Sequence, residues 1–576
     1  MTNKMKQHNS TYIILIAFTA AIGGFLLGYD GSVIAGAAPF YKSVFGLDDG
    51  SLLFGFSVSC LIWGCIFGNF FAGPLSDRIG RKPTLLFAAF LFIISSLITA
   101  LAGNIMVFIA GRIIAGVAVG FAILVAPVFI AEVSPPKKRG WLVSFNQLLI
   151  VIGLSAAYFV NYFILKIIED PLTNWRWMLG VETIPSVIYF FLILLIPESP
   201  RWLIMKGNHD SAIAIMTKVG GEAFAKAEHE NITNSLQQHS HTSNAQQIKE
   251  FFSKKMRLIL IIALGLGIFQ QVSGINSVLY YAPMIFESAG SGRDAAFVQA
   301  IAIGIVFLVV TIISMFIIDR LGRKPLLYAG VSIMALSLLI TGICFHNASY
   351  SLNYKKIEAT AATVMKADVW NAAKKIYPDA INYKNIMLNE EYADVVLAGQ
   401  PVVRINYTNS DLQKSFNNYK EIINSIVVIE EKVFSTEFKL QEAIKTSASK
   451  AVPNLETYIP LLITSAISIN AMLVLISVLG FIAGFSLSLG PVMWAMFSEI
   501  FPNRLRGMAV SIAGTVNSFT SFVVATLFPV QLKAFGSSNT FFIYAAFMFL
   551  CLFFIWKYVV ETKGKSLEEI EKILVR

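Results

Sequence analysis

Charged side chains are scarce in this chain: Asp, Glu, Lys and Arg make up 14% of its 576 residues, whereas hydrophobic residues make up 56%. This composition excludes a soluble multidomain protein, because too few polar residues remain to cover several domain surfaces. Cysteine is rare as well, and the four cysteines lie in or beside apolar runs without the spacing of metal ligands. The pattern argues against a disulfide framework and a zinc site, and the surplus apolar residues require lipid as their solvent.

Catalytic motifs are also missing from the sequence. It contains no nucleophile-base constellation, metal-ligand cluster or phosphate loop, so we expect no enzyme activity, no cofactor and no metal. The formal net charge is +10. In a membrane protein such an excess belongs to the cytoplasmic loops, so a nucleic-acid partner is not expected.

Twelve apolar runs are candidates for helices that cross the bilayer. They fall at about 11–40, 51–73, 83–102, 105–131, 141–166, 177–197, 257–286, 296–318, 325–345, 465–498, 508–533 and 539–560. The first is too long for the apolar region of a signal peptide, so we expect an uncleaved span. With the N-terminus inside, the basic loops that follow even-numbered runs all face the cytoplasm. The sequence therefore predicts a multi-pass all-α protein of the plasma membrane, the inner membrane in a bacterium, with both termini cytoplasmic.

Two polar stretches divide this pattern. Residues 203–256 carry several lysines and predict a cytoplasmic linker with short helices. Residues 346–457 are external by this topology, contain equal numbers of acidic and basic residues, and show apolar residues at helical spacing. We expect an external helical insertion there. The predicted halves are residues 1–202 and residues 257–345 with 458–576, six helices each.

An internal repeat supports two related halves. The segment 76–83, SDRIGRKP, recurs at 318–325 as IDRLGRKP. Glu132 with Arg139-Gly140 recurs as Glu499 with Arg506-Gly507, at an offset larger by about the length of the insertion. Parallel six-helix halves of this kind support alternating access around a site near the membrane midplane.

The repeated charges predict a gate at the cytoplasmic side. An Asp that faces Arg residues across a tight Gly turn can form charge-assisted hydrogen bonds in one state and break them in another. The alternative is that the basic residues only anchor helix ends. The predicted gating residues are Asp77, Arg78, Arg81, Glu132, Arg139, Asp319, Arg320, Arg323, Glu499 and Arg506.

Buried amides predict the binding chemistry. Gln270, Gln271, Asn276 and Tyr280 or Tyr281 lie in an apolar run, where an unpaired amide costs several kcal/mol, so they must face a partner or a water-filled cavity. Amides donate and accept hydrogen bonds, which suits sugar hydroxyls, although hydrogen bonding between helices is the alternative. Gly274 within the group predicts a broken or bent helix.

Four longer strings give the chain a family resemblance. They are GPLSDRIGRKP at 73–83, PESPRWL at 197–203, FQQVSGINSVLYYAP at 269–283 and GPVMWAMFSEIFPNRLRG at 490–507. At these strings the sequence resembles the sugar porters of the major facilitator superfamily, most of all bacterial sugar-proton symporters. The resemblance covers about 11–345 and 465–570 and leaves the insertion uncovered.

The resemblance implies a twelve-helix fold and a set of sugar contacts. These are Gln147, Gln270, Gln271, Asn276, Trp494 and Asn517, to which we add Tyr281 from the amide-rich run. Three positions depart from the family pattern, namely Leu154, Phe307 and Ser518. The resemblance implies a monosaccharide as the substrate, and the three departures leave the choice between a pentose and a hexose open.

Two charges inside apolar runs predict proton coupling. Asp30 and Arg112 each cost about 2.5–3.5 kcal/mol on insertion scales, so they should pair, or one should be neutral. Movement of Arg112 relative to Asp30 would change the proton affinity of the carboxyl between states. The resemblance supports an Asp here for coupling and adds Glu182 as an assisting acid. The alternatives are that Asp30 caps an interfacial helix end and that Glu182 is a structural partner of an Arg.

The sequence thus predicts a proton-coupled sugar symporter that acts as a monomer with a monosaccharide, a proton and the bilayer as its partners. Two other functions stay open. The same body without coupling is a passive facilitator, and a sugar sensor that signals through residues 346–457 is motivated by the insertion.

Overall fold

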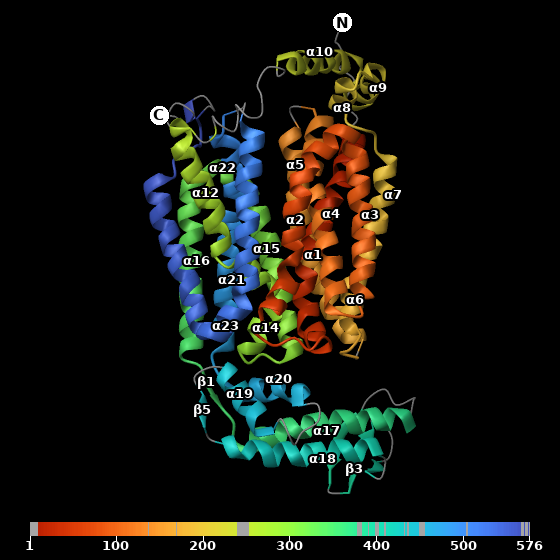
Figure 1. Cartoon of the computed structure of the whole chain (residues 1–576), viewed down its shortest axis with the longest axis vertical. Coiled ribbons are helices and arrows are strands. Elements are labelled where there is room, and N and C mark those ends of the chain that lie inside the picture. The colour runs from red at the N-terminus through yellow and green to blue at the C-terminus, as the bar shows by residue number, and fades with distance from the viewer. Residues whose placement is uncertain are drawn as a thin grey trace.

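The computed structural model describes residues 10–135, 138–168, 170–238, 251, 253–376, 383–389, 391–397, 402–407, 410–430, 432–434, 437–448, 455–502, 505–565, 569–570 and 574. Helices dominate and form two upright bundles, which Figure 1 shows side by side in warm and cool colours. A separate domain made by the insertion lies at one end of the bundles. We call this end the insert end and the opposite end, which carries the repeated segments 76–83 and 318–325, the motif end.

The N-terminal bundle contains the six predicted spans. They are α1 (Ser10–Val44), α2 (Leu52–Ile79), α3 (Arg81–Ala100), α4 (Ile105–Val133), α5 (Arg139–Ile167) and the interrupted pair α6 (Asn174–Gly180) and α7 (Thr183–Leu195). Each is long and apolar enough to cross a membrane. Side-chain caps fix two of the turns at the insert end: Ser51 accepts the Phe54 N–H before α2, and Asn104 accepts the Val107 N–H before α4.

The C-terminal bundle completes the count of twelve. It consists of α12 (Arg257–Val272), α13 (Ile275–Tyr280), α14 (Ala282–Ser288), α15 (Arg293–Leu321), α16 (Arg323–His346), α21 (Ala471–Leu487), α22 (Leu489–Ile500) and α23 (Arg506–Tyr558), after the short η1 (Lys254–Met256). Eleven helical segments of the described chain are long and apolar enough to span. The last, within α23, is two crossings joined at Gly536, whose φ of 78° breaks the helix. The predicted twelve-helix fold is confirmed.

The helix break predicted at Gly274 is confirmed. α12 ends at Val272, and Gly274 adopts a left-handed conformation with φ 83° and ψ 14° before α13 begins. A Cβ at this position would lie 2.5 Å from the ring of Tyr544. Glycine is therefore required by both the backbone and the packing.

Three short helices follow the first bundle at the motif end. They are α8 (Pro200–Met205), α9 (His209–Gly220) and α10 (Glu222–Gln238), as expected for a linker with short helices. A small apolar cluster that includes Leu203, Ala212 and Ala225 holds them together. The predicted polar linker at 239–247 lies outside the described residues.

The insertion contains the expected helices and also two sheets that were not expected. Its helices are α17 (Tyr354–Ile376), α18 (Ser410–Ile426), α19 (Glu437–Ala448) and α20 (Leu455–Ala466), with the short η2 (Val427–Ile429). One antiparallel sheet orders β5 (Val433–Phe434), β1 (Ser349–Ser351) and β6 (Ile467–Ser468). The other orders β2 (Tyr383–Leu388), β3 (Tyr392–Leu397) and β4 (Val402–Asn406).

The insertion extends beyond the predicted residue 457. Leu462 and Ile463 of α20 are buried in the same apolar cluster as Ile357 and Ile422, so α20 is part of the insertion. The predicted boundary at 457 assigns most of α20 to the C-terminal half, although the predicted span begins only at 465. We therefore place the structural limits of the insertion between α16 and α21.

The two bundles contact each other toward the insert end. Ser59 Oγ lies 2.6 Å from Thr526 Oγ1, and Ser155 Oγ donates to the Gly304 carbonyl at 2.8 Å. Tyr158 donates to the Leu279 carbonyl at 2.7 Å. These contacts join α2 to α23, α5 to α15 and α5 to α13, so the structure is closed at the insert end.

Candidate functional site

Four of the predicted amide side chains form one hydrogen-bonded cluster. Asn517 of α23 donates to Gln270 Oε1 and to the Gly267 carbonyl, each at 2.8 Å. Gln271 donates to Gln270 Oε1 at 3.0 Å and to Asn517 Oδ1 at 3.2 Å. The three side chains are at most 7% exposed. The cluster therefore joins α12 to α23 within the C-terminal bundle.

The same cluster extends to the short helix after the break. Asn276 of α13 donates to Gln271 Oε1 at 3.0 Å and to Ser521 Oγ at 2.6 Å. The sequence analysis did not single out Ser521. Its position four residues after Asn517, on the same face of a helix, is the signal that could have found it. We call Gln270, Gln271, Asn276, Asn517 and Ser521 the amide cluster.

Three further predicted contacts lie apart from these bonds. Gln147 is exposed on α5 of the other bundle, and the Trp494 side chain on α22 is 42% exposed. Tyr281 is buried and donates to the Ala525 carbonyl at 3.4 Å, with its ring against Phe54 and Phe528. The hydrogen bonds of the structure therefore do not bring these three side chains into the amide cluster.

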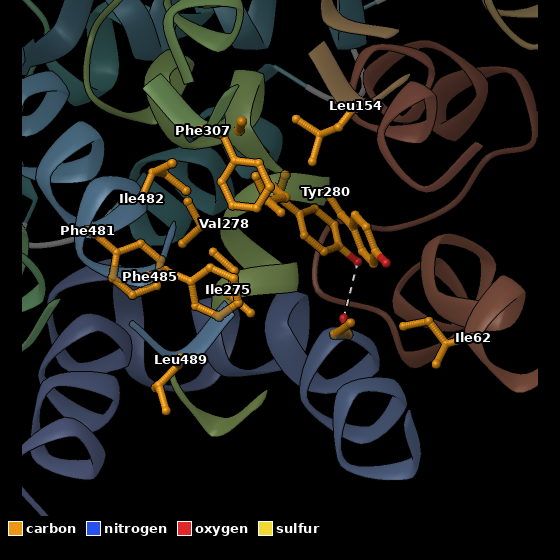
Figure 2. Close-up of a cluster of buried hydrophobic side chains, with 14 of the residues drawn as sticks. Ile62, Leu154, Ile275, Val278, Tyr280, Phe307, Phe481, Ile482, Phe485 and Leu489 are labelled. Atoms are coloured by element: carbon orange, nitrogen blue, oxygen red, sulfur yellow. Dashed lines mark hydrogen bonds between the residues drawn. The ribbon is translucent and has the colours of Figure 1, made fainter. Parts of the chain in front are cut away.

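An apolar cluster lies where α13 meets α15 and α21 between the bundles (Figure 2). Phe307 stacks on Phe485 with ring centroids 6.1 Å apart. Figure 2 shows Leu154 and Ile62 of the N-terminal bundle on the other side of Tyr280. Two of the three departures from the family pattern, Leu154 and Phe307, therefore belong to this apolar contact region.

The two charges predicted to pair are in contact. Asp30 and Arg112 are each 1% exposed, and an Arg112 Nη1 hydrogen bond to Asp30 Oδ1 joins α4 to α1. Arg112 Nη2 also donates to the Asp30 carbonyl at 3.1 Å. Asp30 Oδ2 has no hydrogen-bond partner among the described residues. The pair is therefore buried but incompletely satisfied.

Glu182 is the third member of this charged group. It lies between α6 and α7, is 3% exposed, and interacts electrostatically with Asp30 and Arg112. Within the described chain its Oε1 has no hydrogen-bond partner. Arg112 is therefore bonded to Asp30, while Glu182 lies buried in the electrostatic range of both. An uncompensated buried charge is costly, so the oxygens of Asp30 and Glu182 that lack partners make this group a candidate site for a proton.

The predicted gating charges of the first repeat form a network inside the N-terminal bundle. Arg81 donates to both carboxylate oxygens of Glu132, at 2.9 and 3.1 Å, and to Asp77 Oδ1 at 2.9 Å. Glu198 accepts the backbone N–H groups of Arg81 and Lys82 at 3.1–3.2 Å. This network joins α3 to the end of α4 and to the segment before α8.

The second repeat builds the equivalent network. Arg323 donates to Glu499 Oε1 from two nitrogens, at 2.7 and 3.1 Å. Glu561 accepts the backbone N–H groups of Arg323 at 3.1 Å and Lys324 at 2.9 Å. The side chain of Asp319 lies outside the described residues. Glu198 and Glu561 therefore occupy equivalent positions in the two halves.

Of the remaining predicted gating residues, the three with described side chains, Arg78, Arg139 and Arg320, do not join these hydrogen-bonded pairs. Arg139 lies 3.9 Å from Glu228 of α10 and not against Glu132, because Glu132 is taken by Arg81. Arg78 and Arg320 are exposed, and the side chain of Arg506 is not described. The hydrogen bonds of each network, as far as its side chains are described, join helices of a single bundle.

Comparison with known proteins gives a consistent result. The family described as sugar (and other) transporter matches residues 16–367 and 454–574. The arabinose-proton symporter of Bacillus subtilis is 31% identical, with 99% of this chain and 97% of that protein covered. The D-xylose-proton symporter of Escherichia coli K12 is 30% identical, with coverage of 98% and 96%.

Solved structures agree with the sequence comparisons. A partially occluded inward open conformation of the xylose transporter XylE from E. coli aligns with a TM-score of 0.67 and 28% identity. The alignment covers 96% of this chain and 100% of the XylE chain. These relatives are transporters, and the many apolar helices make this chain a multi-pass membrane protein. The chain belongs to the sugar porters of the major facilitator superfamily.

Proposed function

We propose that the protein imports a monosaccharide, a pentose or a hexose, together with a proton by alternating access. The motif end faces the cytoplasm with both termini, and the insertion is external. Membership of the sugar porters and the names of the relatives, which are arabinose-proton and xylose-proton symporters, support this proposal. The protein acts as a monomer in the plasma membrane, the inner membrane in a bacterium.

The amide cluster supplies the chemistry for a sugar. Its donors and acceptors are satisfied by one another, with bonds of 2.6–3.2 Å. Sugar hydroxyls donate and accept, so they can replace these bonds without leaving buried amides unpaired. Gln147 approaches from the other half, and Trp494 offers a flat apolar face to the C–H side of a sugar ring.

The observation that carries proton coupling is the buried group of Asp30, Glu182 and Arg112. Arg112 is bonded to Asp30 while the insert end is closed. A movement of α4 relative to α1 that separates them leaves Asp30 without its cation, and a proton then neutralises the carboxyl. Proton binding is in this way linked to the state of the carrier.

The gate residues stabilise the motif end of each half. Arg81 with Glu132 and Arg323 with Glu499 hold helix ends together inside one half, so each half moves as a rigid body. In this proposal the exposed Arg78 and Arg320, which lie in the same turns as Asp77 and Asp319, contact the opposite half when the motif end closes. Arg139 and Arg506 begin α5 and α23 at the same end.

The proposal is tested with Asp30→Asn in sealed vesicles. D-xylose, L-arabinose, D-glucose and D-galactose are offered with and without a pH gradient. A proton that crosses about 100 mV supplies about 2.3 kcal/mol, enough for roughly fiftyfold accumulation of the transported sugar. We expect the wild type to accumulate sugar uphill and Asp30→Asn to lose accumulation while it keeps counterflow.

The matched control is Asp294→Asn, which removes an exposed carboxyl from its contact with Lys166. We expect this variant to accumulate sugar normally. Wild-type accumulation that persists with an uncoupler would show that the protein is not proton-coupled. Equilibration without accumulation would make it a passive facilitator.

A further inference from the structure

A partly open chamber lies beneath the insertion, apart from the amide cluster. Its volume is about 340 Å³, within the range of small-molecule pockets, roughly 300–1,000 Å³. Three parts of the chain form its walls. Lys42 and Asp49 come from the N-terminal half, Glu287 from the C-terminal half, and Gln441 and Ile463 from the insertion.

The charged groups of the chamber neutralise each other. Lys42 pairs with Asp49, and Arg293 Nε lies 3.1 Å from Glu287 Oε1. These are the four charged side chains of its lining. With no net charge on its walls, the chamber favours a neutral ligand over an ion.

The rest of the lining suits a ligand with both hydroxyl groups and an apolar face. The Tyr281 ring lies 5.9 Å from that of Phe54 and 5.1 Å from that of Phe528, which gives an aromatic wall. Gln441 and Thr464 add an amide and a hydroxyl from the insertion. Aromatic faces contact C–H groups, and the polar side chains can bond hydroxyls. A neutral polyol of the size of a monosaccharide combines these properties.

The chamber depends on the state of the carrier. The insertion is joined to the C-terminal half through α16 and α21, and α20 packs on α14. It reaches the N-terminal half where Gln441 Nε2 donates to Asp49 Oδ2 at 3.0 Å. Burial by itself would raise the pKa of Asp49, but Lys42 and then Gln441 outweigh it, so the pKa lies below its usual range. Asp49 is therefore the acceptor through which the N-terminal half bonds to the insertion.

We propose that this chamber is a second, external binding site for a neutral polyol of monosaccharide size, formed only while the insert end is closed. Opening of that end separates Asp49 from Gln441 and takes the walls apart. A ligand in the chamber therefore favours the closed state by its differential affinity. This consequence rests on the proposed alternating access, whereas binding to the chamber does not.

Calorimetry on the purified full-length protein tests the site with D-xylose and D-glucose as probes. The double variant Gln270→Ala with Asn517→Ala disables the amide cluster. We expect the wild type to bind two molecules of at least one probe and the double variant to retain one. Gluconate and glucosamine, which are charged, should bind the double variant at least tenfold more weakly.

Filling the chamber then removes the retained molecule. Ile463→Trp fills it from the insertion and Ser288→Trp from the C-terminal half, each in the double-variant background. Leu461→Trp is the matched control, because Leu461 is exposed on the same helix, α20, and is not part of the lining. We expect both filling variants to lose binding at least tenfold and the control to keep it.

Two results would overturn the site. The first is a double variant that binds neither probe. The second is binding by the filling variants that equals binding by the Leu461→Trp control. Sugar uptake by the wild type is measured in parallel. A wild type without uptake refutes the proposed transport function, whereas the calorimetric result alone decides whether the chamber binds a sugar.

Discussion

The two charge networks at the motif end are built alike but not equally buried. In the N-terminal network the side chains of Arg81 and Glu132 are 9% and 10% exposed, whereas Arg323 and Glu499 in the C-terminal network are 14% and 21% exposed. Trp202 also covers the first network and donates to the Asp77 carbonyl at 3.0 Å. The same sequence motif therefore operates in two different dielectric environments.

The difference extends to the carboxylates that cap α3 and α16. Burial raises the pKa of Glu198 above its usual value, because its effect exceeds that of the backbone hydrogen bonds, which lower the pKa. Burial acts in the same direction on Glu561, but there the backbone N–H groups of Lys563, Arg323, Lys324 and Thr562 outweigh it, so its pKa lies below the usual value. Duplication preserved the geometry, and the local surroundings set the direction in which each carboxyl pKa is shifted.

The largest expected effect comes from removal of the central arginine. Breaking a buried pair leaves an uncompensated charge and costs about 3–5 kcal/mol. We expect Arg81→Gln to approach this range and Arg323→Gln to cost clearly less, because water reaches Glu499 more easily. The midpoint of thermal unfolding of the purified variants measures the difference. Arg78→Gln, an exposed neighbour, should change stability by less than about 0.5 kcal/mol, and equal losses for the two arginines would contradict the comparison.

A smaller effect is expected from the two turn glycines. Gly80 has φ 111° and Gly322 has φ 96°, a region in which other residues are strained by about 1–3 kcal/mol. An added Cβ would lie 2.2 Å from Glu198 Oε2 at the first position and 2.8 Å from Glu561 Oε2 at the second. Both Ala substitutions should lower the unfolding midpoint, and Gly80→Ala should lower it more. A larger loss for Gly322→Ala would show that the Glu198 side chain can move away from an added Cβ more easily than the 2.2 Å distance implies.

The smallest effect is the dependence of stability on pH. A carboxyl whose pKa is raised in the fold makes the protein less stable as pH rises from the ordinary value of about 4.3 through the raised one. A lowered pKa gives stability that is lost as pH falls from the ordinary value through the lowered one. Glu198→Gln should therefore flatten the pH profile of the unfolding midpoint above about pH 4.3, and Glu561→Gln should flatten it below. Identical pH profiles for the two variants would contradict the opposite pKa shifts of Glu198 and Glu561.

Much of the fold could be predicted because its causes are local in sequence. A bilayer requires apolar runs of a fixed length, so the twelve spans and the insertion were visible in composition alone. Gly274 marked the broken helix because few other residues tolerate its conformation. Most of α20 was assigned to the C-terminal half, because the sequence shows no break at the point where the insertion ends, and only its packing places it in the core of the insertion. The strands of the insertion have two to six residues, and the sequence analysis did not predict them.

The site could be predicted by residue type more than by partner. The amides of the seventh run were expected to share a purpose, and the structure places Gln270, Gln271 and Asn276 in one cluster with Asn517. Ser521 was missed because a serine in an apolar run is often bonded only to its own helix. Tyr281 was expected near the amides, but it lies among the rings that line the chamber.

The sequence by itself determined the spans, the duplication and the identities of the buried polar groups. Polar groups stand out in apolar runs because an unpaired polar group in lipid is costly. Only the tertiary structure decided which groups meet. In the structure Glu132 pairs with Arg81, and Arg139 lies near Glu228. Gln441 of the insertion donates a hydrogen bond to Asp49 of the N-terminal half. Pairing depends on distances between segments far apart in the chain, and no local pattern encodes those distances.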